Sequence, residues 1–290
     1  MLVIDFHLHV TTVDEYNEWF LDWIRRLHGE RGLAHLRAVL ASPESLLQFM
    51  DEQGIDYVVA LAEMNTMITG VSINDRVAEF CRRSERLIPF ANINPYVTFN
   101  QVAELERCVT KLGVKGLKLY PTYQHFYPND SKLFPIYERA QELSIPVMVH
   151  TGSSVFPGSL MKYGDPLFLD EIAVFFPRLK IIQSHAGRGF WYERAFFLAG
   201  LHENVYMDIT GLPPQNLLKY FPDLERNADK IVFGSDWPGI IDIKKNVAAI
   251  MDLPLNKSTK AKILGRNAAT LLGIEESRGS NRLTQFELDK

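Results

Sequence analysis

The sequence is poor in cysteine and lacks any apolar run long enough to cross a membrane. Its two cysteines, Cys81 and Cys108, form no CxxC-type site, which fits an unpaired buried couple in a reducing compartment. The amino terminus leads straight into an apolar segment, without the basic region of a secretory signal. We therefore expect a soluble, cytoplasmic protein with no membrane partner.

The sequence also lacks a strong charge of either sign and a glycine-rich phosphate motif. The formal net charge of −4 gives no sign of a nucleic-acid or anionic-membrane partner. Hydrophobic residues, in contrast, make up 47% of the 290 positions, which is enough for a large core. The length alone would permit one barrel of roughly 250 residues with insertions or two smaller domains.

Eight apolar runs with the character of buried strands recur along the chain, and helical patterns separate most of them. They cover residues 3–10, 57–62, 87–94, 114–120, 146–151, 180–184, 205–211 and 231–235. Their spacing is about that of a βα unit, so the sequence predicts an α/β protein with a closed parallel (β/α)8 TIM barrel. A doubly wound open sheet is disfavoured because no Gly-rich fingerprint follows the first run.

One connection is much longer than the loop of a simple βα unit. Residues 11–48 hold an aromatic, charged stretch whose apolar positions follow helical spacing, which predicts an inserted helix or two. The insertion could cover the site as a lid, or it could pack elsewhere on the barrel or at a subunit interface, and a homodimer stays open. We expect the barrel to span residues 1–275 and residues 276–290 to form a polar, exposed tail.

Polar side chains occupy the last positions of five of the predicted strands. These residues are His7 and His9 of VIDFHLH, followed along the chain by Lys118, His150, His185 and Asp236. In a (β/α)8 barrel the carboxyl-terminal ends of the strands carry the active site. Taken singly, each residue could be a satisfied core group or a loop cap. Because burying so many polar groups is costly, a shared metal ion is the simplest explanation of all five placements.

Side-chain alternation indicates how the first strand presents its histidines. Residues two apart share a face, so we expect Asp5, His7 and His9 to point toward the barrel axis and Phe6 and Leu8 toward the helices. An HxH pair is a good bidentate platform for Zn²⁺ or a similar ion. Asp5 lies one step deeper and is expected to orient a ligand or to serve as a core hydrogen-bond partner.

With these residues in place, the chain resembles the amidohydrolase superfamily. More narrowly, it resembles the amidohydrolase-related branch that holds amino-carboxymuconate-semialdehyde decarboxylase, γ-resorcylate decarboxylase and the pyrone-dicarboxylate lactonases. The likeness rests on the HxH pair, on single histidines after two later strands and on the Asp of GSDWP. Phrases such as FPRLKIIQSHAG and ENVYMDITG also match, and the likeness runs from Asp5 to about Gly273. The motifs are specific for the superfamily and only weakly so for the reaction.

The resemblance implies a ligand set and a pair of catalytic residues. One divalent metal ion would be held by His7, His9, His150 and Asp236, next to a water molecule. His185 would act as the acid or base for that water, and Asp236 could also accept its proton. Three imidazoles and one carboxylate suit Zn²⁺ best, although Mn²⁺, Fe²⁺ or Co²⁺ would also fit.

Lys118 leaves two arrangements open. In binuclear members of the superfamily a carboxylated lysine on this strand bridges two metal ions, and this chain has every residue that such a site requires. The phrase GLKLYP instead resembles the mononuclear branch, in which Lys118 would be a free cation that contacts the substrate. We favour the mononuclear arrangement.

Further substrate-binding candidates lie in the loops that follow the strands. Arg188 stands where the decarboxylases of this branch usually carry glycine, which puts decarboxylation in doubt. Its guanidinium could bind a substrate carboxylate, or it could form a surface ion pair. His125 and Tyr123, in the aromatic loop TYQHFYPND, complete the predicted substrate-binding set.

Three functions are compatible with such a site. The leading hypothesis is a metal-dependent hydrolase of a C–O or C–N bond in a small, anionic, cyclic substrate such as a lactone or amide, acting through activated water. The alternative is a metal-dependent, non-oxidative decarboxylase of an aromatic or enoic acid. A non-catalytic metal-binding barrel is the third, and the complete set of ligands and base argues against it. The fold does not name the small-molecule substrate.

Overall fold

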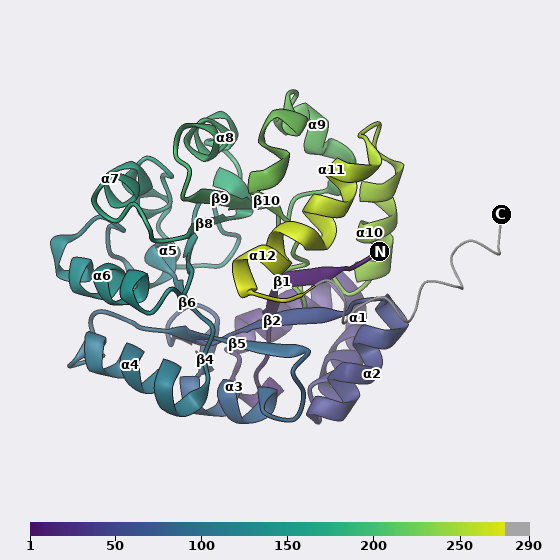
Figure 1. The fold of residues 1–290 in the computed structure, drawn as a ribbon. Coiled ribbons are helices and arrows are strands. Elements are labelled where there is room, and N and C mark those ends of the chain that lie inside the picture. The colour runs from purple at the N-terminus through teal and green to yellow at the C-terminus, as the bar shows by residue number, and fades with distance from the viewer. Residues whose placement is uncertain (276–290) are drawn as a thin grey trace.

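The computed structural model describes residues 1–275, which form a barrel of eight parallel strands surrounded by helices (Figure 1). Neighbouring strands follow one another in chain order. They are β1 (Ile4–His9), β2 (Tyr57–Leu61), β5 (Leu87–Asn92), β6 (Gly116–Leu119), β7 (Val147–His150), β8 (Ile181–Ser184), β9 (Val205–Asp208) and β10 (Ile231–Val232). The Phe6 amide donates to the Phe233 carbonyl, which brings the chain after β10 back to β1. The predicted (β/α)8 barrel is confirmed.

Helices cover the outside of the barrel and connect its strands. They are α2 (Pro43–Gln53), α3 (Asn74–Cys81), α4 (Gln101–Leu112), α5 (Pro121–Gln124), α6 (Phe134–Glu142), α7 (Phe168–Phe175), α8 (Tyr192–Leu201), α9 (Leu217–Tyr220), α10 (Ile243–Asp252), α11 (Lys257–Ala261) and α12 (Asn267–Leu272). A π-helical turn over Lys262–Arg266 joins the last two. In residues 1–275 no helix is both long and apolar enough to span a bilayer. The tail predicted for residues 276–290 lies outside the described residues.

Helix α4 illustrates how local sequence sets these boundaries. Its N-cap Asn100 accepts a hydrogen bond from the amide of Ala103, which satisfies one of the free N–H groups of the first turn. Gly113 ends the helix in the left-handed conformation, where a glycine is favoured. The buried residues Leu105 and Cys108 lie on the face that packs toward the barrel.

The interior of the barrel departs from strict alternation in β1. The pairing of β1 with β2 shifts between Asp5 and Leu8. Phe6 packs edge-on against Phe90 of β5, with ring centroids 5.7 Å apart, in a cluster of interior residues. The expectation that Phe6 faces the helices is therefore wrong, because the irregularity lets Phe6 and His7 both face inward. Leu8 does belong to the outer layer.

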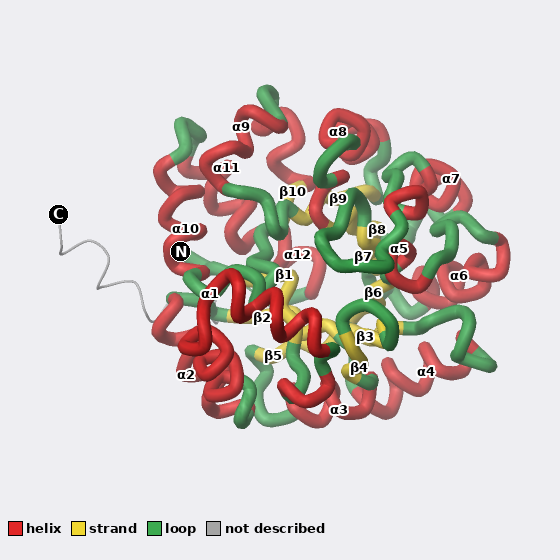
Figure 2. Tube along the Cα trace, turned by 180° about the vertical axis from the view of Figure 1, so that it is seen from behind, coloured by secondary structure: helices red, strands yellow, loops and turns green. Residues whose placement is uncertain are grey.

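The long insertion after β1 forms a kinked helix at the mouth of the barrel. Helix α1 (Glu18–Val39) breaks at Gly29, which has φ +68°, and Figure 2 shows it crossing in front of β1 and β2. His28 Nε2 is 3.0 Å from the Gly239 carbonyl oxygen after β10. The predicted insertion is present as α1 and the start of α2, and its function as a lid stays a prediction.

A hairpin that the sequence patterns did not predict follows β2. It consists of β3 (Glu63–Asn65) and β4 (Gly70–Ser72), paired antiparallel. The Asn17 amide, just before α1, donates to the Thr69 carbonyl, and Tyr16 pairs with Gly70. The hairpin therefore joins the start of α1 to the rim of the barrel.

Candidate metal centre

Two histidines of β1 and one carboxylate after β10 converge at the carboxyl-terminal end of the barrel. Nε2 of His7 and Nε2 of His9 lie 3.5 and 3.6 Å from Oδ1 of Asp236. One potential ligand atom from each of the three residues lies within 4.8 Å of the others. The side chain of His7 is 1% exposed, whereas those of His9 and Asp236 are 16% and 26% exposed. The group is thus open to solvent on one side.

The backbone after β10 is shaped to aim Asp236 at these histidines. Asp236 has φ +65°, a conformation that is uncommon outside glycine, and its amide donates to the His7 carbonyl. A Cβ at Gly234 would lie 2.1 Å from Thr210 Oγ1 and 2.7 Å from the Cβ of His7, so only glycine fits there. Asp5 accepts hydrogen bonds from the amides of His7 and Ser235. It acts as the core hydrogen-bond partner that ties β1 to this turn.

Asp208, at the end of β9, lies directly behind His7. Nδ1 of His7 is 2.7 Å from Oδ2 of Asp208, and the other carboxylate oxygen accepts from the amide of Thr210. Because the carboxylate accepts a hydrogen bond from the Nδ1–H of His7, the proton stays on Nδ1 and Nε2 keeps its lone pair free. Asp208 was not among the predicted site residues, although a carboxylate inside the predicted buried run 205–211 was a usable signal.

His150 and His185 close the other side of the group. Their ring centroids are 4.6 Å apart, and the ring of His185 lies 5.0 Å from that of His7. Nδ1 of His185 is 3.0 Å from the Thr210 carbonyl oxygen, so a proton on Nδ1 leaves Nε2 as the acceptor. Nε2 of His150 is buried and has no hydrogen-bond partner among the described residues.

Burial dominates the protonation of these imidazoles. It holds the pKa of His7, His150 and His185 well below the ordinary value, so each ring is neutral near pH 7. Burial alone would raise the pKa of Asp236, but the nearby histidines and Arg188 hold it well below its usual range. His9 differs: burial lowers its pKa, but Asp236 and Glu63 at its two nitrogens raise the pKa to about 9, so this ring must release a proton before it can bind a metal ion.

Arg188 reaches over the same group from the loop after β8. Its Nε and Nη2 both donate to the Ser153 carbonyl, at 3.3 and 2.9 Å, and its Nη1 is 3.7 Å from Oδ2 of Asp236. A Cβ at Gly211 would lie 2.5 Å from Nη1, so the glycine makes room for the guanidinium. With 21% of its side chain exposed, Arg188 is a cation at the mouth of the site.

The side chain of Lys118, which was predicted to contact the substrate, is fully buried inside the barrel. Its exposed fraction is 0%, and its amine donates to the hydroxyl of Ser184 on β8. Burial lowers the pKa of Lys118 to about 7. The amine therefore lies below the open side of the site, and its contact with substrate stays a prediction.

The remaining predicted residues lie at different distances from the centre. The ring of Tyr123 lies 4.9 Å from that of His150, and its hydroxyl is 2.9 Å from Ser154 Oγ. His125 instead packs on Tyr163 and places Nε2 2.8 Å from the Gly158 carbonyl oxygen. Tyr123 thus lies beside a candidate ligand and His125 contacts an outer loop, and the binding of substrate by either residue stays a prediction.

The donor set fits a divalent metal ion. Two imidazole nitrogens and a carboxylate oxygen already lie together, and the unpartnered Nε2 of His150 supplies a further buried donor of the right chemistry. Imidazole and carboxylate ligands suit Zn²⁺, Mn²⁺, Fe²⁺ and Co²⁺ alike. The preference for Zn²⁺ therefore stays a prediction.

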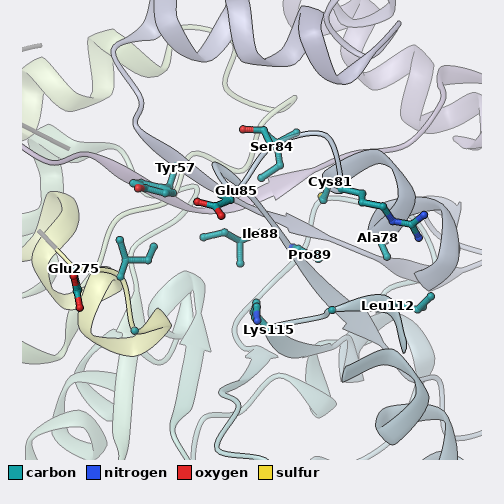
Figure 3. A pocket seen from close by; sticks show the side chains of 15 residues that line it. Tyr57, Ala78, Cys81, Ser84, Glu85, Ile88, Pro89, Leu112, Lys115 and Glu275 are labelled. Carbon is teal, nitrogen blue, oxygen red and sulfur yellow. The ribbon is translucent and has the colours of Figure 1, made fainter. Parts of the chain in front are cut away.

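A cavity of about 510 Å³ lies at the opposite end of the barrel (Figure 3). Three of its lining residues, Tyr57, Glu85 and Lys115, lie before or at the start of strands, and residues 273–275 of the lining follow α12. None of the predicted site residues lines it. The chemistry-bearing side chains thus gather at one end of the barrel and this cavity at the other.

Comparison with known proteins identifies the family that this chain resembles. The family model described as Amidohydrolase matches residues 4–274. The chain is 23% identical over 243 residues to a 2-amino-3-carboxymuconate-6-semialdehyde decarboxylase of Dictyostelium discoideum, covering 71% of this chain and 67% of that protein. It is 31% identical over 171 residues to a 2-keto-4-carboxy-3-hexenedioate hydratase of a Sphingobium strain, a match that covers 49% of each.

A solved structure with the same fold carries a metal ion. It is a dihydroxybenzoic acid decarboxylase from Polaromonas sp. JS666 with bound manganese and the inhibitor 2-nitroresorcinol. The TM-score is 0.63 at 22% sequence identity, with 97% of this chain and 99% of that chain covered. The predicted resemblance to the amidohydrolase-related branch is confirmed.

Proposed function

Because this chain belongs to the amidohydrolase family, we propose that it is a metal-dependent, non-oxidative decarboxylase of a small aromatic or enoic acid. The observation that carries this proposal is the cluster of His7, His9 and Asp236 with Arg188 at its open side. The named relatives and the solved neighbour include decarboxylases, and they support this reaction better than the hydrolysis expected from the sequence.

His7, His9, His150 and Asp236 would hold one divalent ion. Such an ion supplies Lewis-acid polarisation of a substrate oxygen when it is bound. Asp208 keeps Nε2 of His7 directed toward the cluster, and Asp236 contributes the negative charge. This set adds His150 to the three residues whose ligand atoms already lie together. The buried Nε2 of His150 otherwise has no hydrogen-bond partner among the described residues.

Arg188 would bind an anionic group of the substrate. A guanidinium has five N–H donors, and Ser153 occupies those on the Nε edge. The two terminal nitrogens keep donors on their outer edge for a carboxylate or phenolate oxygen. The exposure of Arg188 at the mouth, against the burial of Lys118, makes Arg188 the better anchor.

His185 would hold and deliver the proton that the reaction needs. Decarboxylation breaks the C–C bond to the carboxylate, releases CO₂ and leaves an electron pair on carbon that must take up one proton. His185 engages Thr210 through Nδ1 and its ring is neutral near pH 7, so Nε2 is the atom we assign to take up a proton from solvent water and pass it to carbon. Asp236 is the neighbouring group that can share the same proton.

Addition of water is a second candidate, because the 31% identical relative is a hydratase. The same site would then use His185 as the base that takes a proton from water. Hydrolysis of a lactone or amide uses the same groups and is the least supported of the three. All three reactions act on a small carboxylic acid or its derivative.

Product analysis tests the proposal. We would load the protein with Mn²⁺ and offer 2,6-dihydroxybenzoate and a panel of hydroxybenzoates, enoic acids and lactones in D₂O. We would measure CO₂ release, deuterium at the former carboxyl carbon, and the release of acid. We expect one CO₂ and one deuteron per turnover, and none after chelation of the metal. Hydration of an enoic acid or acid release from a lactone, each without CO₂, would replace decarboxylation by the corresponding reaction.

A further inference from the structure

Glu63 is a buried carboxylate that lies against the metal centre and has no place in the predicted ligand set. It is the first residue of β3 and is 2% exposed. Its Oε1 is 3.6 Å from Nδ1 of His9, while Nε2 on the other side of that ring is 3.6 Å from Asp236 Oδ1. The imidazole thus lies between two carboxylates, one at each nitrogen.

The hairpin holds the second oxygen of Glu63. Oε2 accepts from Thr69 Oγ1 at 2.5 Å and from Asn65 Nδ2 at 2.9 Å. Nδ1 of His9 is buried and has no full hydrogen bond among residues 1–275. Because Oε2 is engaged within the hairpin, Oε1 is the oxygen that remains for His9.

We propose that Glu63 is a positioning residue for His9. Held by the β3–β4 hairpin, Glu63 orients the imidazole of His9 and thereby raises the affinity of the centre for its metal ion. This inference rests on the metal binding proposed above. A carboxylate that accepts a hydrogen bond from the Nδ1–H of a histidine fixes the ring orientation and tautomer and makes Nε2 the better ligand. Asp208 has the corresponding place behind His7 at a shorter distance, 2.7 Å against 3.6 Å, so each histidine of β1 has its own carboxylate behind it.

The hairpin connects this carboxylate to the start of helix α1. Asn17 Nδ2 donates to the Thr66 carbonyl, and Trp19 Nε1 donates to the Ile68 carbonyl. A Cβ at Gly70 would lie 2.2 Å from the Glu15 carbonyl oxygen, so the two segments touch closely there. The loop that fixes Glu63 therefore also supports the segment at the mouth.

Metal titration of the metal-free protein tests the proposal without any substrate. We would add Co²⁺ in competition with a chelator and record both the affinity and the visible absorption spectrum of the bound ion. For Glu63→Gln we expect roughly 10- to 100-fold weaker binding and an altered spectrum. Asp208→Asn is the reference for a carboxylate behind a ligand. Glu15→Gln is the matched control, because Glu15 contacts Thr11 and Arg76 and no histidine.

A second variant separates positioning from folding. Thr69→Val keeps the size of the side chain and removes one donor to Oε2, so binding should weaken less than in Glu63→Gln. Added to Glu63→Gln, the Thr69→Val substitution should not weaken Co²⁺ binding further, because Thr69 acts on the metal site only through Glu63. Wild-type affinity and spectrum in both single variants would overturn the inference; should Glu63→Gln fail to fold, wild-type behaviour of Thr69→Val alone would overturn it. A wild-type protein that takes up no Co²⁺ would instead overturn the proposed metal centre.

Discussion

The two ends of the barrel differ in how their polar side chains are satisfied. At the carboxyl-terminal end, Nε2 of His150 and Nδ1 of His9 are buried without hydrogen-bond partners in the described chain. At the amino-terminal end, Arg86 donates to the carbonyls of Ile55 and Asp56 and pairs with Asp51, at 2.7 to 2.9 Å. Arg86 is thus satisfied by its own chain, whereas His150 has a ring nitrogen left for a ligand.

This difference indicates where the protein buries polar atoms at a cost in stability because its function requires them. Buried polar atoms without partners are rare because each forfeits the hydrogen bonds that it made with water. A cluster of them at the end where (β/α)8 enzymes carry their active sites points to binding and catalysis. We therefore expect substitutions at the mouth to change metal content and turnover, and substitutions in the lower barrel to change stability alone.

The largest effect should follow from loss of a ligand at the mouth. His7→Ala or Asp236→Ala should weaken metal binding by more than the roughly 10- to 100-fold that an outer carboxylate contributes, and turnover should fall with it. Elemental analysis of protein purified without chelator measures the loss. Lys115→Ala, at the other end, is the control and should keep both properties. More than one ion per wild-type chain would instead favour the binuclear arrangement around Lys118.

Removing the proposed proton carrier should separate turnover from metal content. His185→Asn keeps a polar side chain beside the Thr210 carbonyl but cannot carry the proton. Turnover should fall by about 10²- to 10⁴-fold, the range for a general acid or base, while the metal stays bound. If His185→Asn is isolated metal-free, His185 is a ligand and the assignment of roles at the mouth must change.

Much of the difference between the two ends of the barrel could be predicted from the sequence, because the residue at the end of a strand is recognised from the apolar run directly before it. The runs around His7, His150, His185 and Asp236 showed both the barrel and the residues at its mouth. Glu63 could not be found in this way, since its place beside His9 depends on a hairpin with no pattern of its own. Phe6 was misplaced for a related reason, as a shift in pairing with β2 overrides the expected alternation.

In the lower barrel, overpacking should lower stability without touching the chemistry. A Cβ at Gly116 would lie 2.3 Å from the ring of Phe90, in a cluster of fully buried interior residues. Gly116→Ala should therefore lower the free energy of unfolding by about 1–3 kcal/mol, with the metal content unchanged. Urea denaturation beside elemental analysis measures both. A stable Gly116→Ala protein would show that Phe90 has room to move, and loss of the metal would show that the two ends are coupled.

The smallest effect concerns a charge at the amino-terminal end, where Lys230 precedes β10. Burial, and then the nearby Lys180, lower the pKa of Lys230, while its amine donates to the Glu203 carbonyl. A lysine whose pKa is lower in the folded state binds fewer protons there than in the unfolded state. Its contribution to the free energy of unfolding therefore rises as the pH rises through the folded-state pKa. The contribution is constant above the unfolded-state pKa of about 10.4. The stability of the wild type relative to Lys230→Met should therefore increase by a few tenths of a kcal/mol between neutral and alkaline pH, since Lys230 is only partly buried. Urea unfolding of both proteins across that range measures the difference. A relative stability that falls with pH would mean that the carbonyl and the Tyr206 ring, 4.7 Å from the amine, stabilise the cation more than burial disfavours it.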